Sequence, residues 1–197
     1  MNRILVGIVT PGSIRWECSW SLDAARAAGC FEELRFQESG PYVDNARNRL
    51  VERFLDTDCD RLLMVDSDIS FLPADITRLA DDDLDVVSGV YYNFFDGVLT
   101  PVLKLLPDTP AADEPLLEVA GTGAGFLMIS RSLLEKMAPV YGQPCPWFFE
   151  PIRDGDHMGE DMEFCARARE MGVGVYIDLR VQLGHYKTVR ISPPTLD

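Results

Sequence analysis

The feature that most constrains the fold is a short apolar run that ends in two carboxylates. Residues 62–65 are Leu-Leu-Met-Val, and Asp66, Ser67 and Asp68 follow at once. A continuous apolar run of this length, bounded by polar residues, is typical of a central strand of a parallel sheet. In open α/β sheets, ligands bind outside the carboxyl ends of the strands. The sequence therefore predicts a ligand site at Asp66 and Asp68.

The spacing of the two aspartates favours a divalent cation. Residues two apart in an extended chain point to the same side, so we expect both carboxylates to face one ligand. Two carboxylates this close repel each other unless a positive group lies between them. A hard cation such as Mg²⁺ or Mn²⁺, carrying substrate phosphates, meets that need. Asp-x-Asp also occurs by chance, and carboxylates after a strand often cap the next helix, so this alternative stays open.

Length and composition are those of one globular domain, which we take to cover residues 1–197. The hydrophobic fraction is 47% and the charged fraction is 25%, ordinary values for a soluble protein. No apolar run approaches the roughly 20 residues that span a bilayer, and the N-terminus lacks a signal-peptide pattern. The five cysteines are scattered without a Cys-x-x-Cys pair. We therefore expect a cytoplasmic protein without disulfides or stable membrane insertion.

Strands and helices alternate along the chain. Apolar runs predict strands at residues 3–10, 34–37, 61–66, 85–92, 126–129 and 173–179, with an edge strand at 99–106. Helical spacing of apolar residues predicts helices at residues 21–28, 44–55, 73–80, 131–137 and 160–171. This alternation predicts an α/β, Rossmann-like fold. Its sheet is twisted and mainly parallel, with a small antiparallel portion near residues 99–129 and helices on both faces.

The helix predicted at 44–55 has an unusual first turn. Asp44 is the expected N-cap, and Arg47 and Arg49 lie close behind it. Cations at a helix N-terminus oppose the helix dipole, so a bound anion would explain them. Pairing of the arginines with nearby acids or with water is the alternative.

Several motifs with possible ligand roles follow in the second half of the chain. Gly121–Gly125 precede a strand, so they form neither a Walker loop nor a dinucleotide fingerprint, although their backbone can approach a ligand closely. Trp147–Phe149 belong either to the core or to a wall that stacks on a sugar or base. Glu160 and Asp161 lie in a first helical turn, where the dipole favours carboxylates. His185, near the end of the chain, is a plausible third ligand for Mn²⁺.

Taken in order, these motifs resemble small GT-A-fold glycosyltransferases, in the broad family-2-like group that includes short bacterial and phage proteins. The matching segments are ILVGIVTPG, DNARNRLVERFL, RLLMVDSDISF, VVSGVYY, GTGAGFLMISR, GEDMEFCARAREMG and GHYKT. The resemblance implies one GT-A-like domain. It also implies metal-dependent transfer of a sugar from a nucleotide-diphosphate sugar to an acceptor hydroxyl, with inversion.

The resemblance also implies roles for particular residues. The metal site for Mn²⁺ or Mg²⁺ is implied to be Asp66, Asp68 and His185, with Asp68 binding the ion directly. Asp161 is implied as the general base, and Glu160 as a partner of a sugar or acceptor hydroxyl. The residues implied in nucleotide-sugar binding are Thr10, Pro11, Arg15, Asn45, Arg47, Arg49, Asp66, Ser67, Gly123 and Ala124.

Other functions stay open at this point. A nucleotidyltransferase acting on a sugar phosphate would use the same metal chemistry. It generally needs a glycine-rich, basic loop after the first strand, whereas residues 10–15 hold one glycine and one arginine. An inactive nucleotide-sugar-binding module would have no need of a base such as Asp161. A retaining mechanism would assign the base differently.

The acceptor is expected to be a glycan or another hydroxyl compound. The net charge of −14 repels phosphate backbones at long range and disfavours a modified DNA base as the acceptor. A local basic track would still permit DNA. Its candidate members are Arg15, Arg47, Arg153, Lys187 and Arg190.

Overall fold

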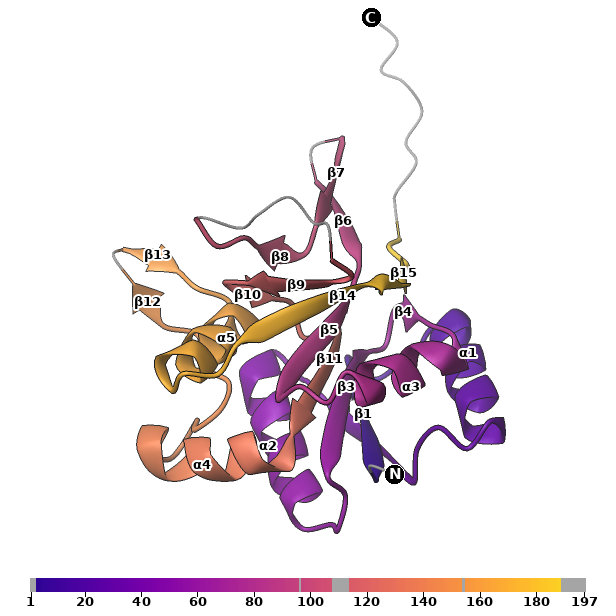
Figure 1. Ribbon diagram of the computed structural model, residues 1–197, viewed down its shortest axis with the longest axis horizontal. Helices are drawn as coiled ribbons and strands as arrows, with labels where there is room; N and C mark the ends of the chain where they lie inside the picture. Colours follow the sequence, from indigo (N-terminus) through magenta and orange to yellow (C-terminus); the bar gives the residue numbers. More distant parts are fainter. Residues whose placement is uncertain (1–2, 96, 108–113, 154, 189–197) are drawn as a thin grey trace, which may run out of the picture.

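The chain is built around a seven-stranded sheet, shown in the computed structural model of Figure 1. The structure describes residues 3–95, 97–107, 114–153 and 155–188. Across the sheet the strands follow the order β2 (Glu33–Glu38), β1 (Ile4–Thr10), β3 (Arg61–Asp66), β11 (Phe126–Ser130), β5 (Val86–Val90), β14 (Val175–Gln182) and β9 (Leu116–Val119). β11 runs antiparallel to β3 and β5, and β9 runs antiparallel to β14, while the remaining pairs are parallel. The predicted mainly parallel sheet with an antiparallel portion is confirmed.

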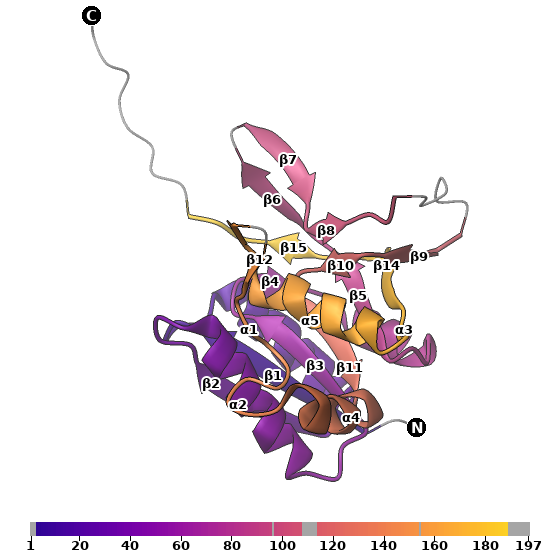
Figure 2. The ribbon, with the colours of Figure 1, turned by 90° about the vertical axis from the view of Figure 1, so that its left-hand side faces the viewer.

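Helices cover both faces of this sheet, as predicted. α2 (Val43–Leu55), α4 (Arg131–Tyr141) and α5 (Glu160–Glu170) pack on one face, and α1 (Trp16–Ala27) and α3 (Pro73–Asp81) pack on the other. Figure 2 looks onto the face that carries α2, α4 and α5. Within the described ranges, no helix combines the length and the apolar character needed to cross a membrane.

The apolar run in β3 is buried on both sides, as expected of a central strand. Leu62 and Met64 belong to the core beneath α2, α4 and α5. Leu63 and Val65 alternate with them and belong to the core beneath α1 and α3. Two-sided burial explains why this run shows no polar alternation. It also fixes Asp66, the next residue, at the carboxyl edge of the sheet.

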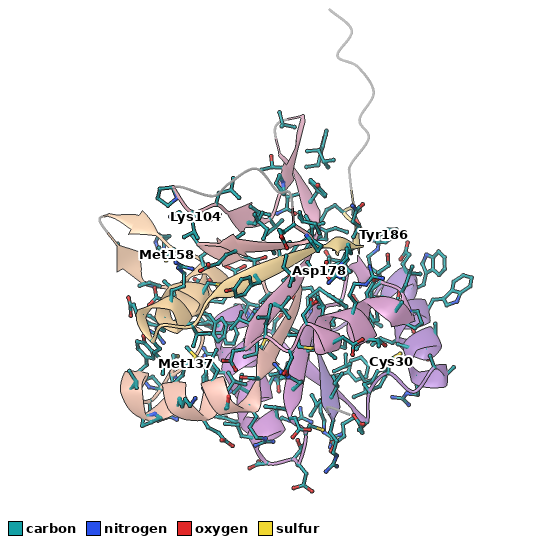
Figure 3. All side chains as sticks on the ribbon, viewed as in Figure 1. Cys30, Lys104, Met137, Met158, Asp178 and Tyr186 are labelled. Atoms are coloured by element: carbon teal, nitrogen blue, oxygen red, sulfur yellow. The ribbon has the colours of Figure 1, made fainter. Side chains whose placement is uncertain are left out.

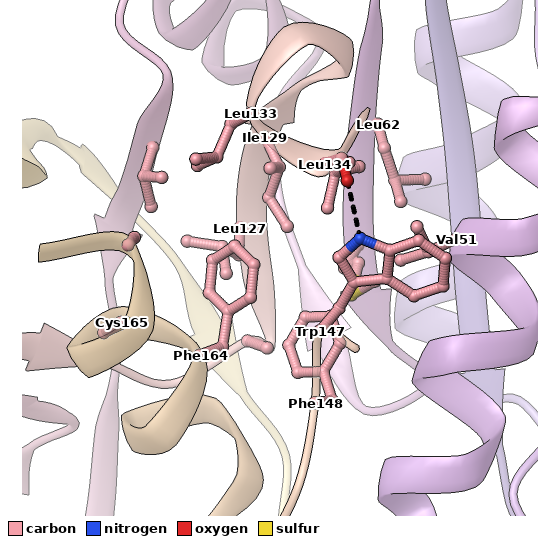
Figure 4. Packing of buried hydrophobic residues seen from close by; sticks show 14 of the residues in the cluster. Val51, Leu62, Leu127, Ile129, Leu133, Leu134, Trp147, Phe148, Phe164 and Cys165 are labelled. Carbon is pink, nitrogen blue, oxygen red and sulfur yellow. Dashed lines mark hydrogen bonds between the residues drawn. The ribbon is translucent and has the colours of Figure 1, made fainter. Parts of the chain in front are cut away.

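The aromatic segment after α4 belongs mainly to the core, which settles the choice left open for it. Trp147 and Phe148 are buried, and Phe148 stacks on Phe164 of α5 with ring centroids 4.7 Å apart (Figure 4). The Trp147 indole N–H donates to the carbonyl of Leu134 at 2.8 Å. Only Phe149 is exposed. The buried Trp147 and Phe148 rings pack with α4 and α5 in the core and are not available as a stacking wall for a ligand.

Two predicted helix starts are corrected. α1 begins at Trp16 rather than at Ser21, and its buried positions include Cys18 and Leu22. The exposed Trp16 and Trp20 break the expected apolar pattern, which is why periodicity missed the first turn. α2 begins at Val43, with Tyr42 at the N-cap position.

Asp44 is therefore not the N-cap that the sequence predicts. It lies in the first turn of α2, where its Oδ1 accepts the N–H of Asn45 at 2.7 Å. A carboxylate there still complements the helix dipole. The residue keeps a favourable electrostatic position but not the predicted capping geometry.

Within the described ranges, four two-stranded sheets accompany the main sheet. They pair β6 (Tyr92–Phe95) with β7 (Val98–Pro101), β8 (Leu103–Lys104) with β10 (Gly121–Thr122), β12 (Ile152–Arg153) with β13 (Asp156–His157), and β4 (Ile69–Ser70) with β15 (Gly184–His185). The strands predicted at 85–92 and 99–106 are each divided, since the chain leaves the main sheet after β5 and forms the β6–β7 hairpin. The β4–β15 pair matters most for function, because it brings the end of the chain to the edge where β3 ends.

Candidate active site

The predicted ligand residues gather at the carboxyl edge of the parallel strands. β1 ends at Thr10 and β3 ends at Asp66. Just beyond β3, His185 of β15 lies opposite Ile69 of β4. The backbone N–H of Tyr186 donates to the carbonyl of Asp68 at 2.9 Å. The short β4–β15 pair thus brings a residue near the C-terminus beside the turn that follows β3.

Asp66 and Asp68 have different partners within the protein. β3 ends at Asp66, and Ser67 and Asp68 form a turn, so the expected strand alternation stops before Asp68. Asp66 Oδ1 accepts from Arg47 at 3.1 Å, whereas Asp68 Oδ2 accepts from Lys187 at 2.8 Å. In the part of the chain that the structure describes, no three His, Cys, Asp or Glu side chains are grouped to hold a metal ion. The predicted metal trio is split, because Asp68 lies with His185 and Asp66 joins a different cluster.

Asp68, His185 and Lys187 form the first of two charged clusters. His185 Nε2 lies 3.5 Å from Asp68 Oδ2, and the Lys187 ammonium binds the same oxygen. Burial raises the pKa of Asp68, but the hydrogen bonds and charges of His185 and Lys187 outweigh burial and lower this pKa to about 2. The carboxylate therefore stays ionised at every physiological pH and attracts cations.

The orientation of the His185 ring fits a role as a cation ligand. His185 Nδ1 lies 2.9 Å from the carbonyl oxygen of Tyr92. A carbonyl only accepts, so Nδ1 carries a proton; Nε2 then donates to Asp68 Oδ2 in the charged ring and presents its lone pair to that oxygen in the neutral ring. Two acceptors facing each other repel unless a cation lies between or beside them. A backbone carbonyl that fixes the histidine tautomer is also a usual outer partner of a metal-binding histidine.

Arg47 is the centre of the second cluster and is not an exposed anion receptor. Arg47 is only 4% exposed. Its Nε donates to Glu160 Oε1 at 2.9 Å, one terminal nitrogen donates to Asp66, and the other donates to the carbonyl of Ala124 at 3.1 Å. The expected anions at this arginine are thus two carboxylates of the protein itself. Burial lowers the pKa of Arg47, but the charges of Asp66 and Glu160 raise it well above its ordinary value, so the guanidinium stays charged.

Glu160 and Asp161 open α5 on the other side of Arg47. Glu160 is buried against the guanidinium, while Asp161 Oδ1 accepts the N–H of Met162 at 2.7 Å. A Cβ added at Gly159 would lie 2.9 Å from Asp161 Oδ1, so the glycine of the Gly-Glu-Asp motif makes room for the carboxylate. Burial and the charge of Glu160 raise the pKa of Asp161, and Arg47 opposes them. A raised pKa is the direction that suits a carboxylate general base.

The glycine-rich segment is explained by a neighbouring tyrosine. A Cβ added at Gly123 would lie 2.0 Å from the Tyr91 hydroxyl oxygen, and one at Gly125 would lie 2.9 Å from it. The Tyr91 hydroxyl accepts the N–H of Gly125 at 3.1 Å, and the carbonyl of Gly125 accepts the N–H of Asp66 at 2.9 Å. The phenol thus requires glycine here, and it links this segment to Asp66. Gly123 and Ala124 are both buried.

The ligand residues predicted in the turn after β1 differ in their exposure and in their hydrogen-bond partners. The Thr10 hydroxyl donates to the carbonyl of Ser13 and accepts the N–H of Gly12, so it shapes the turn. Pro11 is exposed. The N–H of Arg15 donates to the carbonyl of the buried Ser67 at 2.9 Å, which holds the turn against the one that carries Asp68.

Among the described residues, Asn45 and Arg49 are not brought into these clusters. Asn45 and Arg49 lie on the exposed side of α2, away from the face that carries Arg47. The side chain of Arg153 and all of Arg190 lie outside the described residues, so the proposed basic track is described only for its other members. Of those, Arg47 is buried between carboxylates and cannot contact DNA.

Two residues near the site, Tyr91 and Asn48, were given no role from the sequence, and Lys187 was named only as a candidate member of a basic track. Tyr91 lies edge-on to the His185 ring, with centroids 5.3 Å apart, and burial and the charge of Asp66 raise its pKa. Lys187 binds Asp68. Asn48 fastens the Trp147–Phe148 backbone to α2 with bonds of 2.7–3.3 Å. Tyr91 follows β5 directly. Its position at the carboxyl end of a predicted strand could have indicated a role in the site.

Comparison with known structures supports the fold. The structure of A197 from STIV has a TM-score of 0.68 and 22% identity, covering 94% of this chain and 86% of that chain. The structure of GalNAc-T7 with UDP, GalNAc and Mn²⁺ has a TM-score of 0.57 and 9% identity, covering 93% of this chain and 44% of that chain. The inositol-1-phosphate CTP transferase from T. maritima has a TM-score of 0.49, too low to carry an argument.

No protein-family model and no curated protein matches the sequence. At the identities found among solved structures, the likeness concerns the fold, and the chain spans less than half of the GalNAc-T7 chain. The chain therefore has a mixed α/β, GT-A-like fold.

Proposed function

We propose that this protein is a metal-dependent glycosyltransferase that moves a sugar from a nucleotide-diphosphate sugar to an acceptor hydroxyl with inversion. The observation that carries the proposal is the facing pair of Asp68 Oδ2 and His185 Nε2 at the carboxyl edge of a GT-A-like sheet. The second cluster, which includes Asp66 at the end of β3, supplies a further carboxylate, Asp161, whose environment raises its pKa. A cation-binding pair and a candidate base are the combination that glycosyl transfer requires.

Asp68 and His185 would hold Mn²⁺ or Mg²⁺ together with the donor diphosphate. Ions of this kind are commonly held by one or two protein groups, with waters and substrate phosphates completing the shell. When bound, the cation would act as a Lewis acid that stabilises the leaving diphosphate. GalNAc-T7, which shares the fold, was crystallised with UDP, GalNAc and Mn²⁺, which supports this choice of donor and ion.

Arg15 and Lys187 are the exposed cations best placed to add positive charge at the diphosphate. The Arg15 side chain is 39% exposed and the Lys187 side chain 53%. Lys187 Nζ donates a hydrogen bond to Asp68 Oδ2. Because a cation on that oxygen would compete with the ammonium, we propose that Lys187 shifts from Asp68 to the diphosphate when the donor binds.

Asp161 would remove the proton from the acceptor hydroxyl, and Glu160 together with Arg47 would position it. A cavity of about 670 Å³ adjoins this end of α5, and its lining includes Gly159, Met162 and Lys104. Gly159 and Met162 flank the two acids in sequence, so the cavity adjoins the helical turn that carries Asp161. We propose that the cavity admits the acceptor.

The proposal is tested by thermal unfolding with UDP, GDP, CDP, TDP and ADP, each with and without Mn²⁺. We expect one diphosphate to stabilise the protein only when Mn²⁺ is present. At a hundred times the dissociation constant, the free energy of unfolding rises by about 2.7 kcal/mol. Stabilisation by a nucleoside triphosphate alone would favour the nucleotidyltransferase, and no stabilisation by any nucleotide would contradict both transferases.

A further inference from the structure

A second cavity lies on the other side of the Asp68–His185 pair, between α1, β4 and the end of β15. Its volume is about 350 Å³, and its lining includes Trp16, Trp20, Glu17, Ser70 and Tyr186. In Figure 3, Tyr186 lies on the opposite side of the molecule from Lys104 and Met158, which line the cavity beside α5. We call this second cavity the tryptophan groove. It takes no part in the reaction proposed above.

The groove is marked by aromatic side chains that the fold leaves uncovered. Trp16 is 64% exposed and Trp20 is 66% exposed, and their ring centroids are 5.5 Å apart with the planes inclined at 42°. Tyr186, 37% exposed, lies at the same groove. Tryptophan is highly buried on average, so two exposed indoles side by side are not needed by the core. They form an open aromatic surface one helical turn long.

The groove also carries an acid, Glu17, among its lining residues. Glu17 Oε2 is buried and forms an ion pair with Arg15 Nε at 3.4 Å, although neither atom makes a hydrogen bond. A ligand hydroxyl can donate a hydrogen bond to a carboxylate. The Ser70 side chain adds a hydroxyl to the lining.

This combination selects the chemical class of the occupant. Aromatic faces pack against the C–H faces of a sugar ring, while buried acids and hydroxyls bind its hydroxyl groups. The acid in the lining and the net charge of −14 disfavour phosphates, nucleic acids and anionic membranes. A purely apolar partner would offer no hydrogen-bond donor to the Glu17 carboxylate. A neutral saccharide meets all of these conditions.

We infer that the tryptophan groove binds a neutral oligosaccharide, with sugar rings stacked on Trp16 and Trp20 and hydroxyls bonded to Glu17. Tyr186, which lines the groove, donates its backbone N–H to the carbonyl of Asp68. The groove therefore adjoins the candidate active site. If the proposed function holds, the groove retains a glycan whose other end is modified. Binding itself needs neither a nucleotide nor a cation.

The test uses the full chain and three neutral probes, namely chitotriose, mannotriose and maltotriose, with trigalacturonate as the charged comparison. Two of the three tryptophans lie in the groove and Trp147 is buried, so acrylamide quenching of fluorescence reports on the groove. We expect at least one neutral trisaccharide to protect the fluorescence saturably and trigalacturonate to give no protection. By calorimetry, Trp20→Ala and Trp16→Ala should each weaken that binding by about tenfold or more, and Glu17→Gln should weaken it as well.

Phe94→Ala is the matched control, because Phe94 is also 66% exposed but belongs to β6. It should bind the trisaccharide as the native protein does. Protection by none of the neutral probes, or unchanged affinity in the Trp16→Ala/Trp20→Ala double variant, would overturn the inference. So would sedimentation showing that the groove is covered by a second copy. The Asp68→Ala variant separates the two proposals, because it should lose donor binding and keep trisaccharide binding.

Discussion

Replacement of Arg47 by methionine is expected to lower the free energy of unfolding by about 3–5 kcal/mol, the range for breaking a buried ion pair from one side. The guanidinium is buried and bonds Asp66, Glu160 and the carbonyl of Ala124. Methionine fills most of the volume but leaves two carboxylates facing each other without a cation. Urea unfolding followed by circular dichroism measures the loss.

Arg49→Met is the matched control for this experiment. Arg49 is two residues further along α2, on its exposed side, so the same substitution should change stability by no more than about 0.5 kcal/mol. Asp66→Asn in the Arg47→Met background should recover part of the loss, since one of the two unpaired carboxylate charges is then removed. Equal stability of the Arg47→Met and Arg49→Met proteins would contradict the role given to Arg47 as the bridge of the second cluster.

Asp161→Asn is expected to lower the rate of transfer by about 10²–10⁴-fold, the usual contribution of a general base. Asparagine keeps the size of the side chain but cannot take a proton. Because the Asp68–His185 pair is untouched, binding of the diphosphate should be unchanged. The turnover number and the diphosphate affinity are measured on the same preparation, so that a folding defect is not mistaken for a catalytic one.

The pH dependence of the native enzyme gives an independent check on this base. Burial and the charge of Glu160 raise the pKa of Asp161 above its ordinary value of 3.8. The base must be ionised, so activity should fall as the pH drops through this raised pKa. Asp161→Asn should remove that acid limb. Near-normal turnover in the variant would indicate a retaining mechanism or another base.

Much of the fold could be predicted because its signals are local. The apolar run of β3 and the helical spacing of α2 and α3 come within a few residues of the observed elements. The two carboxylates at the end of β3 also locate the functional edge, because parallel strands place their carboxyl ends together. These predictions needed only the pattern of neighbouring residues.

The arrangement within the site depends on contacts that a local pattern does not contain. β4 and β15 have two residues each, too few to show periodicity, yet their pairing brings His185 and Lys187 to Asp68. Likewise, the carboxylates near Arg47 are Asp66 and Glu160, and Glu160 is 113 positions further along the chain. That Asp66 and Asp68 share one ligand stays a prediction, and the strand that was expected to align them ends between them.

The most direct test of the central claim is calorimetric titration of the diphosphate found in the thermal screen into the native protein and Asp68→Ala. Asp58→Ala serves as the control, because the Asp58 side chain is 89% exposed and far from His185 in the sequence. We expect native and Asp58→Ala proteins to bind the diphosphate tightly only with Mn²⁺. Asp68→Ala should fold normally and lose the dependence on Mn²⁺ together with most of the affinity. Unchanged Mn²⁺-dependent binding by Asp68→Ala would contradict the assignment of Asp68 and His185 as the cation site.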